Sequence, residues 1–163
     1  VPDCIRAWSK GEAVAVRSPQ ATRPWQHVLE PLSGYLWLGA RLWRKSDGLN
    51  GEAFNFGPDA HVNQTVVELL SAMANRWPGV QWQVPEGREQ GGHEATLLKL
   101  SCDKVLFHLN WRAVLQFPET VEFTADWYHA WYEGQQDLYA YTVAQIEHYC
   151  QLARARGMPW VQA

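Results

Sequence analysis

The stretch that decides the fold is residues 17–43, RSPQATRPWQHVLEPLSGYLWLGARLW. It follows a short alternating apolar segment, residues 13–16, which predicts a strand that ends at Ser18-Pro19. From residue 28 to residue 43 apolar side chains recur at helical spacing and predict a helix. The loop between them carries arginines, an indole, an amide and an imidazole. Such side chains make a poor core, and we expect this loop to contact a ligand.

The chemistry of the loop suits a phosphorylated ligand. Arg17 and Arg23 flank it, and a guanidinium can bind phosphate oxygens two at a time. Trp25 and His27 follow, and an aromatic face can pack on a base or a sugar ring. The alternative for the arginines is that both are solvated surface residues, which composition alone favours. The stiff Pro24 beside Arg23 argues for the ligand site.

Two further polar residues are candidates for ligand contact. Asn55 stands between two phenylalanines in EAFNFG (residues 52–57), a predicted strand, and ligands of α/β folds gather at the carboxyl ends of strands. The solvent-facing position of an edge strand is an equal alternative. His93 follows two glycines that would let the backbone approach a ligand, although a surface histidine in a loop fits the spacing better.

The tryptophan- and tyrosine-rich segment near residue 130 favours packing over ligand binding. Trp127-Tyr128 and Trp131-Tyr132 resemble a platform for stacking sugars. However, the two tryptophans are four residues apart and share one helical face with Phe123, so they are better interpreted as packing residues.

Composition limits the classes of protein that fit. A chain of 163 residues, 47% hydrophobic and 19% charged, predicts one globular domain. The net charge of -3 provides no basic face, so we expect no nucleic-acid partner. Cys4, Cys102 and Cys150 are an odd number without Cys-x-x-Cys, which indicates reduced thiols in a cytoplasmic protein. Their spacing with the histidines does not suit zinc, and no apolar run is long enough for a membrane span.

Helices and short strands alternate along the chain, so the predicted fold class is mixed α/β. The expected helices cover residues 2–8, 28–43, 62–77, 101–109, 117–133 and 142–156, and the expected strands cover residues 13–16, 52–57, 80–84 and 94–100. The sequence contains no glycine-rich dinucleotide motif, no phosphate loop, no Tyr-x-x-x-Lys and no nucleophile elbow. The motifs therefore predict binding without identifiable chemistry.

Four stretches resemble the C-terminal half of the extended short-chain dehydrogenase/reductases that act on nucleotide sugars, and within them the CDP-glucose 4,6-dehydratases. Residues 17–43 are the most specific, with Pro24 where relatives commonly have aspartate. GEAFNFGP (51–58), GHEATLLKLSCDKVLFHLNW (92–111) and TVEFTADWYHAWYEG (120–134) are similar to further segments of that family. Asn110 replaces a usual glycine. Together the four stretches span most of the chain.

The resemblance implies roles for the loop residues. Arg23 would contact the diphosphate or ribose of a nucleotide, with Arg17 and Gln20 lining the same loop. His93 would lie near the pyrophosphate. Some relatives carry an arginine three residues before that histidine, where this chain has Gln90. The first helix, residues 2–8, would lie beside the pocket for the base.

The resemblance also implies what this chain lacks. The NAD-binding turn, the catalytic tyrosine and lysine and the acid/base pair of the family precede the segment that matches Val1. Residues 1–163 would then be a single substrate-binding region, fragment-like, with no catalytic residue and no cofactor of its own. The parent, a lyase of deoxysugar and O-antigen biosynthesis, would convert CDP-glucose to CDP-4-keto-6-deoxyglucose with NAD. A non-catalytic binding module or a protein-interaction module on the same scaffold are the alternatives.

Without a dinucleotide-binding half, apolar side chains would lose a partner. We expect the face formed by Leu36, Trp37, Trp43, Phe54 and Phe56 either to be exposed and to cause self-association or to be repacked.

Overall fold

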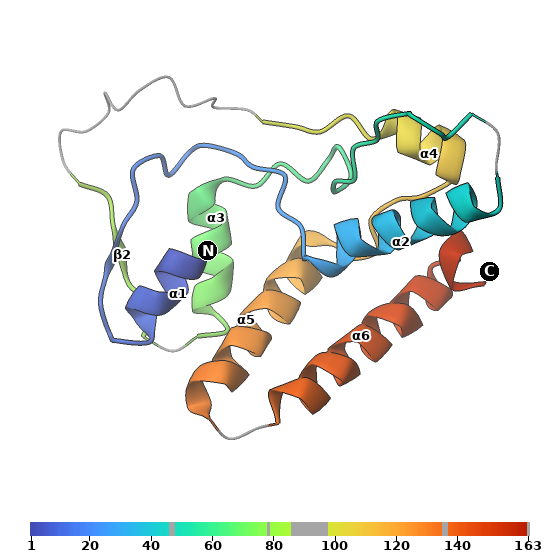
Figure 1. Ribbon diagram of the computed structural model, residues 1–163. Coiled ribbons are helices and arrows are strands. Elements are labelled where there is room, and N and C mark those ends of the chain that lie inside the picture. Colours follow the sequence, from blue (N-terminus) through green and yellow to red (C-terminus); the bar gives the residue numbers. More distant parts are fainter. Residues whose placement is uncertain (46–47, 78, 86–97, 135–136, 163) are drawn as a thin grey trace.

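The computed structural model describes residues 1–45, 48–77, 79–85, 98–134 and 137–162, and all structural statements refer to these ranges. They form a helix-rich mixed α/β arrangement with one small parallel sheet (Figure 1). The elements in chain order are α1 (Pro2–Trp8), β1 (Val14–Ala15), α2 (Leu29–Trp43), α3 (Val66–Ala74), β2 (Trp82–Gln83), α4 (Asp103–Leu109), α5 (Phe117–Glu133), α6 (Leu138–Ala155) and the 3-10 helix η1 (Pro159–Val161). In the sheet, Val14 pairs with Trp82 and Ala15 with Gln83.

Helix boundaries follow the local capping chemistry. The bounds of α5 match the prediction, because Gln116 and Glu119 form a capping box at its start and Gly134 ends it with a φ of 62°. Helix α3 begins later than predicted, after Thr65, whose hydroxyl accepts from the amide of Glu68 in a second capping box. Helix α6 begins earlier than predicted, because the Asp137 side chain accepts from two amides of its first turn.

Two predictions of local structure are wrong. Residues 52–57 form no strand, although the expected alternation is present: Phe56 is buried, Phe54 is half-buried and Asn55 is exposed. Within the described ranges, no strand pairs with them to supply a ladder of hydrogen bonds. Ser101 does not cap α4, since Cys102 holds the N-cap position without a side-chain hydrogen bond. The strand expected at residues 94–100 lies mostly outside the described residues, and residues 98–100 have no regular structure.

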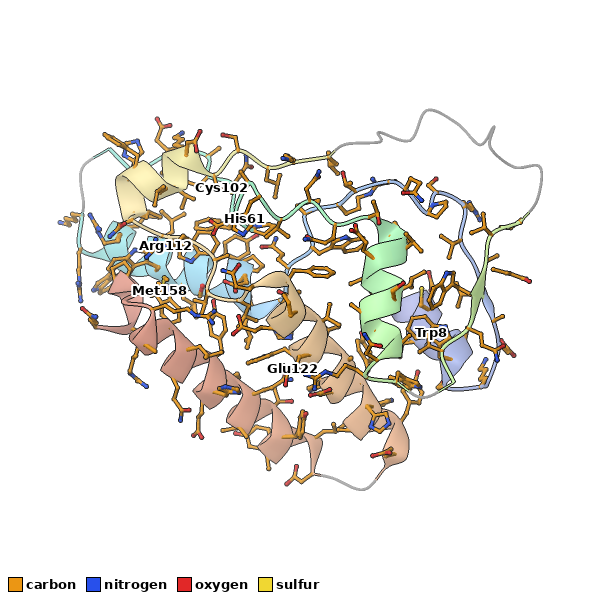
Figure 2. The ribbon with its side chains drawn as sticks, turned by 180° about the vertical axis from the view of Figure 1, so that it is seen from behind. Trp8, His61, Cys102, Arg112, Glu122 and Met158 are labelled. Atoms are coloured by element: carbon orange, nitrogen blue, oxygen red, sulfur yellow. The ribbon has the colours of Figure 1, made fainter. Side chains whose placement is uncertain are left out.

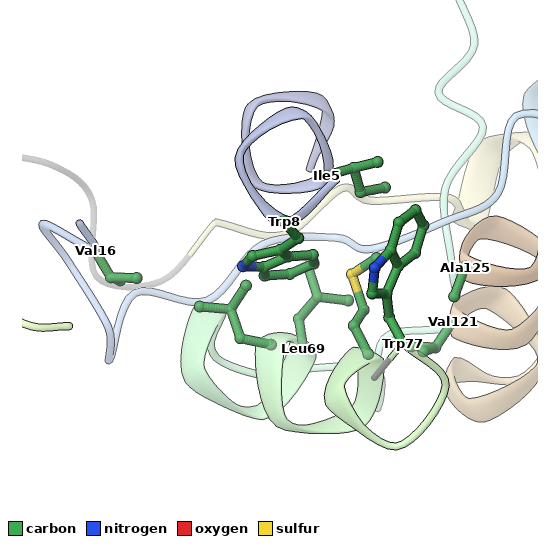
Figure 3. Packing of buried hydrophobic residues seen from close by; sticks show 9 residues of the cluster. Ile5, Trp8, Val16, Leu69, Trp77, Val121 and Ala125 are labelled. Carbon is green, nitrogen blue, oxygen red and sulfur yellow. The ribbon is translucent and has the colours of Figure 1, made fainter. Parts of the chain in front are cut away.

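Most of the buried apolar side chains of the described residues group into three clusters. The first cluster joins α1, α3 and α5 and comprises Ile5, Trp8, Val16, Leu69, Leu70, Met73, Trp77, Val121 and Ala125 (Figure 3). The second cluster joins α2 and α4 and comprises Trp37, Leu49, Phe56, Val105, Leu109, Trp111 and Ala113. The third cluster joins α5 and α6 and comprises Val114, Leu115, Phe123, Tyr149, Ala153 and Met158. Figure 2 labels one residue for each cluster, and the three lie in different parts of the molecule. Trp8 belongs to the first cluster, Cys102 packs against the second, and Met158 belongs to the third.

The face expected to lack a partner is only partly exposed. Leu36 is 76% and Trp43 is 88% exposed, as expected. Trp37 and Phe56 are buried instead, because both pack in the second cluster. The indole nitrogen of Trp37 donates to the carbonyl of Leu109 at 2.9 Å, which ties α2 to the end of α4. Helix α4 therefore covers one side of α2 and leaves the opposite side open.

Gly34 lies where α2 meets Phe56, and a methyl group there is expected to destabilise the fold. An added Cβ would lie 2.1 Å from Cδ1 of Phe56. The Phe56 ring cannot move freely, because it packs edge-on against Trp111 and Tyr35 at centroid distances of 5.0 and 5.3 Å. We expect Gly34→Ala to lower the free energy of unfolding by about 1–3 kcal/mol, measured by urea denaturation, despite the better helix propensity of alanine.

Gly39 provides the matched control in the same helix. Nothing lies within 4 Å of a Cβ built there. Gly39→Ala should therefore leave stability unchanged or raise it by up to ~1 kcal/mol. Equal shifts in the two variants at the same dilute protein concentration would show that Phe56 moves aside.

Candidate functional site

The loop that the sequence singled out is fastened to the start of α3. The amides of Val67 and Val66 donate to the carbonyls of Pro19 and Ala21, each at 3.0 Å. Thr22 forms an antiparallel bridge with Thr65, the N-cap of α3. These contacts fix the course of residues 19–22 and direct the following residues toward the middle of the molecule.

After this bridge the loop forms one wall of a pocket of about 460 Å³. Trp25 is held there by a hydrogen bond of 2.9 Å from its indole nitrogen to the carbonyl of Gln64. The other walls come from the start of α1 and from α3, α5 and α6. The pocket is lined by Val1, Pro2, Trp25, Gln26, His27, Val28, Leu29, Leu69, Met73, Thr120, Val121, Thr124, Trp127, Tyr128, Thr142, Gln145 and Ile146. None of these side chains is an aspartate, glutamate, lysine or arginine.

Most polar groups in the pocket already have partners within the protein. The hydroxyls of Thr124 and Thr142 donate to carbonyls of their own helices at 2.8 and 2.7 Å. The indole nitrogen of Trp127 donates to the hydroxyl of Thr142 at 2.9 Å. The amide of Gln145 donates to the carbonyl of Phe123 at 2.7 Å. The pocket therefore offers aromatic and aliphatic walls with few unused polar atoms, which suits an uncharged, flat or apolar group.

His27 is the histidine among the lining residues, and it is neutral near pH 7. Its ring is 8% exposed and packs edge-on against Phe123 at 5.6 Å. Nδ1 accepts from the amide of Leu29 at 3.4 Å, so the proton of the neutral ring lies on Nε2. Burial lowers the pKa of His27 to about 4. His27 is thus a neutral hydrogen-bond donor rather than a cation for phosphate.

The structure brings together two of the residues predicted to bind substrate. Trp25 and His27 both line the pocket. Arg17 and Gln20 are exposed and do not line it. Arg23 is half-buried, donates to the carbonyl of Thr22 at 2.7 Å and also lies outside the lining. The arginines and the pocket are therefore separate features of one loop.

Of the remaining two predicted residues, Asn55 is not part of this pocket. Asn55 is exposed, and its side-chain amide donates to the carbonyl of Ser101 at 3.2 Å. His93 and Gln90 lie outside the described residues, so their roles stay predictions.

Sequence reasoning missed several residues of the pocket. Gln26 lines the pocket although the sequence analysis does not propose it as a ligand contact. Its amide donates to the carbonyl of Phe56 at 3.1 Å, and its buried Oε1 has no partner among the described residues. Trp127 was interpreted as a packing residue, and its ring does stack on Trp131 at 6.1 Å. It also lines the pocket, as do Tyr128 and Gln145. The sequence carries no signal that these late residues meet residues 25–29.

The described part of the chain shows no group of three or more histidine, cysteine, aspartate or glutamate side chains arranged to hold a metal ion. Within the same ranges, none of the helices combines the length and hydropathy that crossing a membrane requires.

Comparison with known proteins shows which class of protein this chain is similar to. No family model matches it. It is similar to a nucleotide-sugar dehydratase. That relative is the CDP-glucose 4,6-dehydratase of Salmonella typhimurium, to which 138 residues of this chain are 36% identical. The match covers 85% of this chain and 38% of the relative, so the chain spans about two fifths of the length of the relative. The resemblance found in the sequence is confirmed.

Proposed function

We propose that this chain is the nucleotide-sugar-binding portion of a CDP-glucose 4,6-dehydratase-like protein, with CDP-glucose or a related nucleotide sugar as its ligand. The observation that carries the proposal is the 36% identity with a CDP-glucose 4,6-dehydratase over 85% of this chain. The structure supports it in one respect: the loop of residues 17–27 is anchored on α3 and contributes Trp25 and His27 to a pocket.

The charges of the loop suggest which part of such a ligand would lie in the pocket and which part would contact the arginines. The pocket is uncharged and suits a ring, whereas the diphosphate needs the arginines. Arg23 lies two residues before Trp25, so their Cα atoms are within about 7 Å of each other. A ligand with a ring in the pocket would thus have its phosphates within reach of the Arg23 side chain. Arg17 and Gln20 are exposed on the same loop and would contact the outer part of the ligand.

The dehydration itself is proposed for the whole protein and not for this chain. NAD would supply reversible oxidation of the sugar when bound. The residues present do not suit it, because β1 is followed by Arg17-Ser18-Pro19 rather than by a glycine-rich turn. We therefore assign this chain no catalytic residue and no step through NAD, and expect it to be inactive alone. The proposed setting is deoxysugar and O-antigen biosynthesis in the cytoplasm.

A protein-interaction module without catalytic function is the second candidate. The observation that favours it is the exposed apolar side of α2, where Leu36 and Trp43 are largely exposed. Such a module would bind a protein and no nucleotide.

Calorimetric titration with CDP-glucose tests the first proposal, with UDP-glucose and CDP for comparison. We expect saturable binding that prefers the cytidine ligands and weakens by roughly 10-fold to 100-fold in Arg23→Ala, because a charge-assisted hydrogen bond to phosphate is lost. Arg154→Ala, an exposed arginine near the end of α6, is the control and should bind normally. No heat with any ligand from a chain shown to be folded would contradict binding by this chain alone. Equal weakening in the two variants would indicate non-specific attraction.

A further inference from the structure

A closed circuit of contacts joins the binding loop to the last two long helices. The amide of Glu30 donates to the carbonyl of His27 at 3.0 Å, and the hydroxyl of Tyr149 on α6 donates to the Glu30 carboxylate at 2.9 Å. One turn earlier on α6, the side chain of Gln145 donates to the carbonyl of Phe123 on α5 at 2.7 Å. The ring of Phe123 packs edge-on against His27, with the ring centroids 5.6 Å apart. The path thus returns to the residue from which it started.

The circuit lies in the interior and reaches two walls of the pocket. Glu30, Tyr149, Phe123 and His27 are all buried, and α5 and α6 lie side by side (Figure 1). His27 lines the pocket from the loop, and Gln145 lines it from α6. The circuit therefore fixes the loop wall of the pocket relative to the α6 wall.

Glu30 is the member of the circuit whose side chain is held most firmly. Its carboxylate accepts from the amide of Val114 at 2.9 and 3.0 Å and from the amide of Leu115 at 2.6 Å. The carbonyl of Val114 in turn accepts from Arg156 at the end of α6. A buried carboxylate held by backbone amides cannot move without breaking costly hydrogen bonds. The backbone of Glu30 is fixed with it, and so is the carbonyl of His27.

We propose that Glu30 is a positioning residue for the pocket: through this circuit its carboxylate fixes the orientation of the His27 ring in the pocket wall. For the effect on ligand affinity, this inference rests on the proposed nucleotide-sugar binding. Glu30 is not among the residues that line the pocket, so it acts on a ligand through His27. Trp25 and Gln26 precede His27 in the same wall, and their positions depend on the same anchor.

An NMR titration of the histidine ring signals tests this role without any ligand. Burial lowers the pKa of His27 to about 4. In Glu30→Gln the carboxamide accepts from one of the amides of Val114 and Leu115 but directs its own N–H groups at the other. We expect the His27 ring to become more exposed and its pKa to rise toward the ordinary value of 6.5. Loss of the negative charge alone would lower this pKa, so a rise reports movement of the ring.

Tyr149→Phe tests the circuit while Glu30 keeps its charge. The substitution removes the hydroxyl that joins α6 to Glu30 and keeps the ring that stacks on Trp160 at 5.7 Å. We expect the pKa of His27 to rise here too, by less than in Glu30→Gln, because both backbone amides keep their acceptor. If Glu30→Gln does not fold, this variant decides the question.

Leu109→Ala is the control for a loss of stability alone. Leu109 is 1% exposed in the second cluster, which is formed by residues outside the circuit. Its truncation leaves a cavity and destabilises the fold, but the pKa of His27 should stay at about 4. A pKa of His27 that is unchanged or lowered in Glu30→Gln would overturn the proposal, as would an equal rise in Leu109→Ala. Circular dichroism must show that each variant is folded.

Calorimetric titration with CDP-glucose at pH 7 tests the consequence for binding. We expect Glu30→Gln to raise the dissociation constant by roughly 10-fold and Leu109→Ala to leave it unchanged. Equal affinities of the unmodified chain and Glu30→Gln would overturn the role of Glu30 in the pocket. Absence of binding to the unmodified chain would instead contradict the proposed function, and the titration of His27 would still decide whether Glu30 positions its ring.

Discussion

Glu30→Ala is expected to lower the free energy of unfolding by about 3–5 kcal/mol. The carboxylate of Glu30 is 1% exposed and joins three parts of the chain. It accepts from the amide of Val114 at 2.9 and 3.0 Å, from the amide of Leu115 at 2.6 Å and from the hydroxyl of Tyr149 at 2.9 Å. Truncation leaves the two buried amides without a partner, and each such loss destabilises a protein by about 1–3 kcal/mol. The Tyr149 hydroxyl loses one of its two partners and keeps the Ser33 hydroxyl at 3.1 Å.

Chemical denaturation at pH 7 measures this effect. Glu30→Gln keeps the volume and one acceptor oxygen, so we expect a smaller loss than in Glu30→Ala. Glu147→Ala removes an exposed carboxylate from α6 and should change stability by no more than about 0.5 kcal/mol. A loss below about 1 kcal/mol in Glu30→Ala would mean that water replaces the carboxylate at the amides of Val114 and Leu115.

Acidification is expected to destabilise the chain through His27. Burial lowers the pKa of His27 in the folded state to about 4, while the ordinary value is 6.5. Between these pH values the unfolded chain binds more protons than the folded chain. Stability that is present above pH 6.5 is therefore lost as the pH falls toward 4, by up to about 3 kcal/mol.

The comparison of wild type with His27→Gln isolates this contribution. Burial raises the pKa of Glu30, so that group alone would make the chain more stable as the pH falls, with the opposite sign. Glu30 is unchanged in His27→Gln, and the difference in unfolding free energy between pH 7 and pH 4 reports on His27. His148→Gln, whose exposed ring packs on the same Phe123 at 5.3 Å, should keep the acid-induced loss. Equal losses in wild type and His27→Gln would refute the prediction.

The parts of the fold that could be predicted from the sequence are determined by residues that lie close together along the chain. Helix α5 was placed correctly because Phe123, Trp127 and Trp131 recur at helical spacing and Gly134 marks its end, and both are local signals. The strand at residues 52–57 was wrong because alternation predicts a strand only where another strand can pair with it. Here the amide of Gln26 donates to the carbonyl of Phe56, and Asn55 reaches Ser101. Side-chain hydrogen bonds thus take the place of a ladder.

The candidate site likewise could be predicted only where its residues lie close together along the chain. Trp25 and His27 were found because an aromatic ring and an imidazole in a loop before a helix are unusual. Gln145 and Ile146 lie more than a hundred residues later, and spacing along the chain carries no information about such contacts. Glu30 looked like an ordinary acidic residue in the first turn of a helix. Its importance became visible only once the amides of Val114 and Leu115 were placed beside it.

The division of the interior into three clusters also gives each cluster its own chemical reporter. Cys4 packs against the first cluster and Cys102 against the second. Cys150 follows Tyr149 of the third cluster on α6, and all three thiols are half-buried and free. A thiol reacts when its surroundings open, so the rate at which each cysteine is alkylated reads the local opening of a different region. The native chain thus contains three built-in probes that can tell whether its regions open together or one at a time.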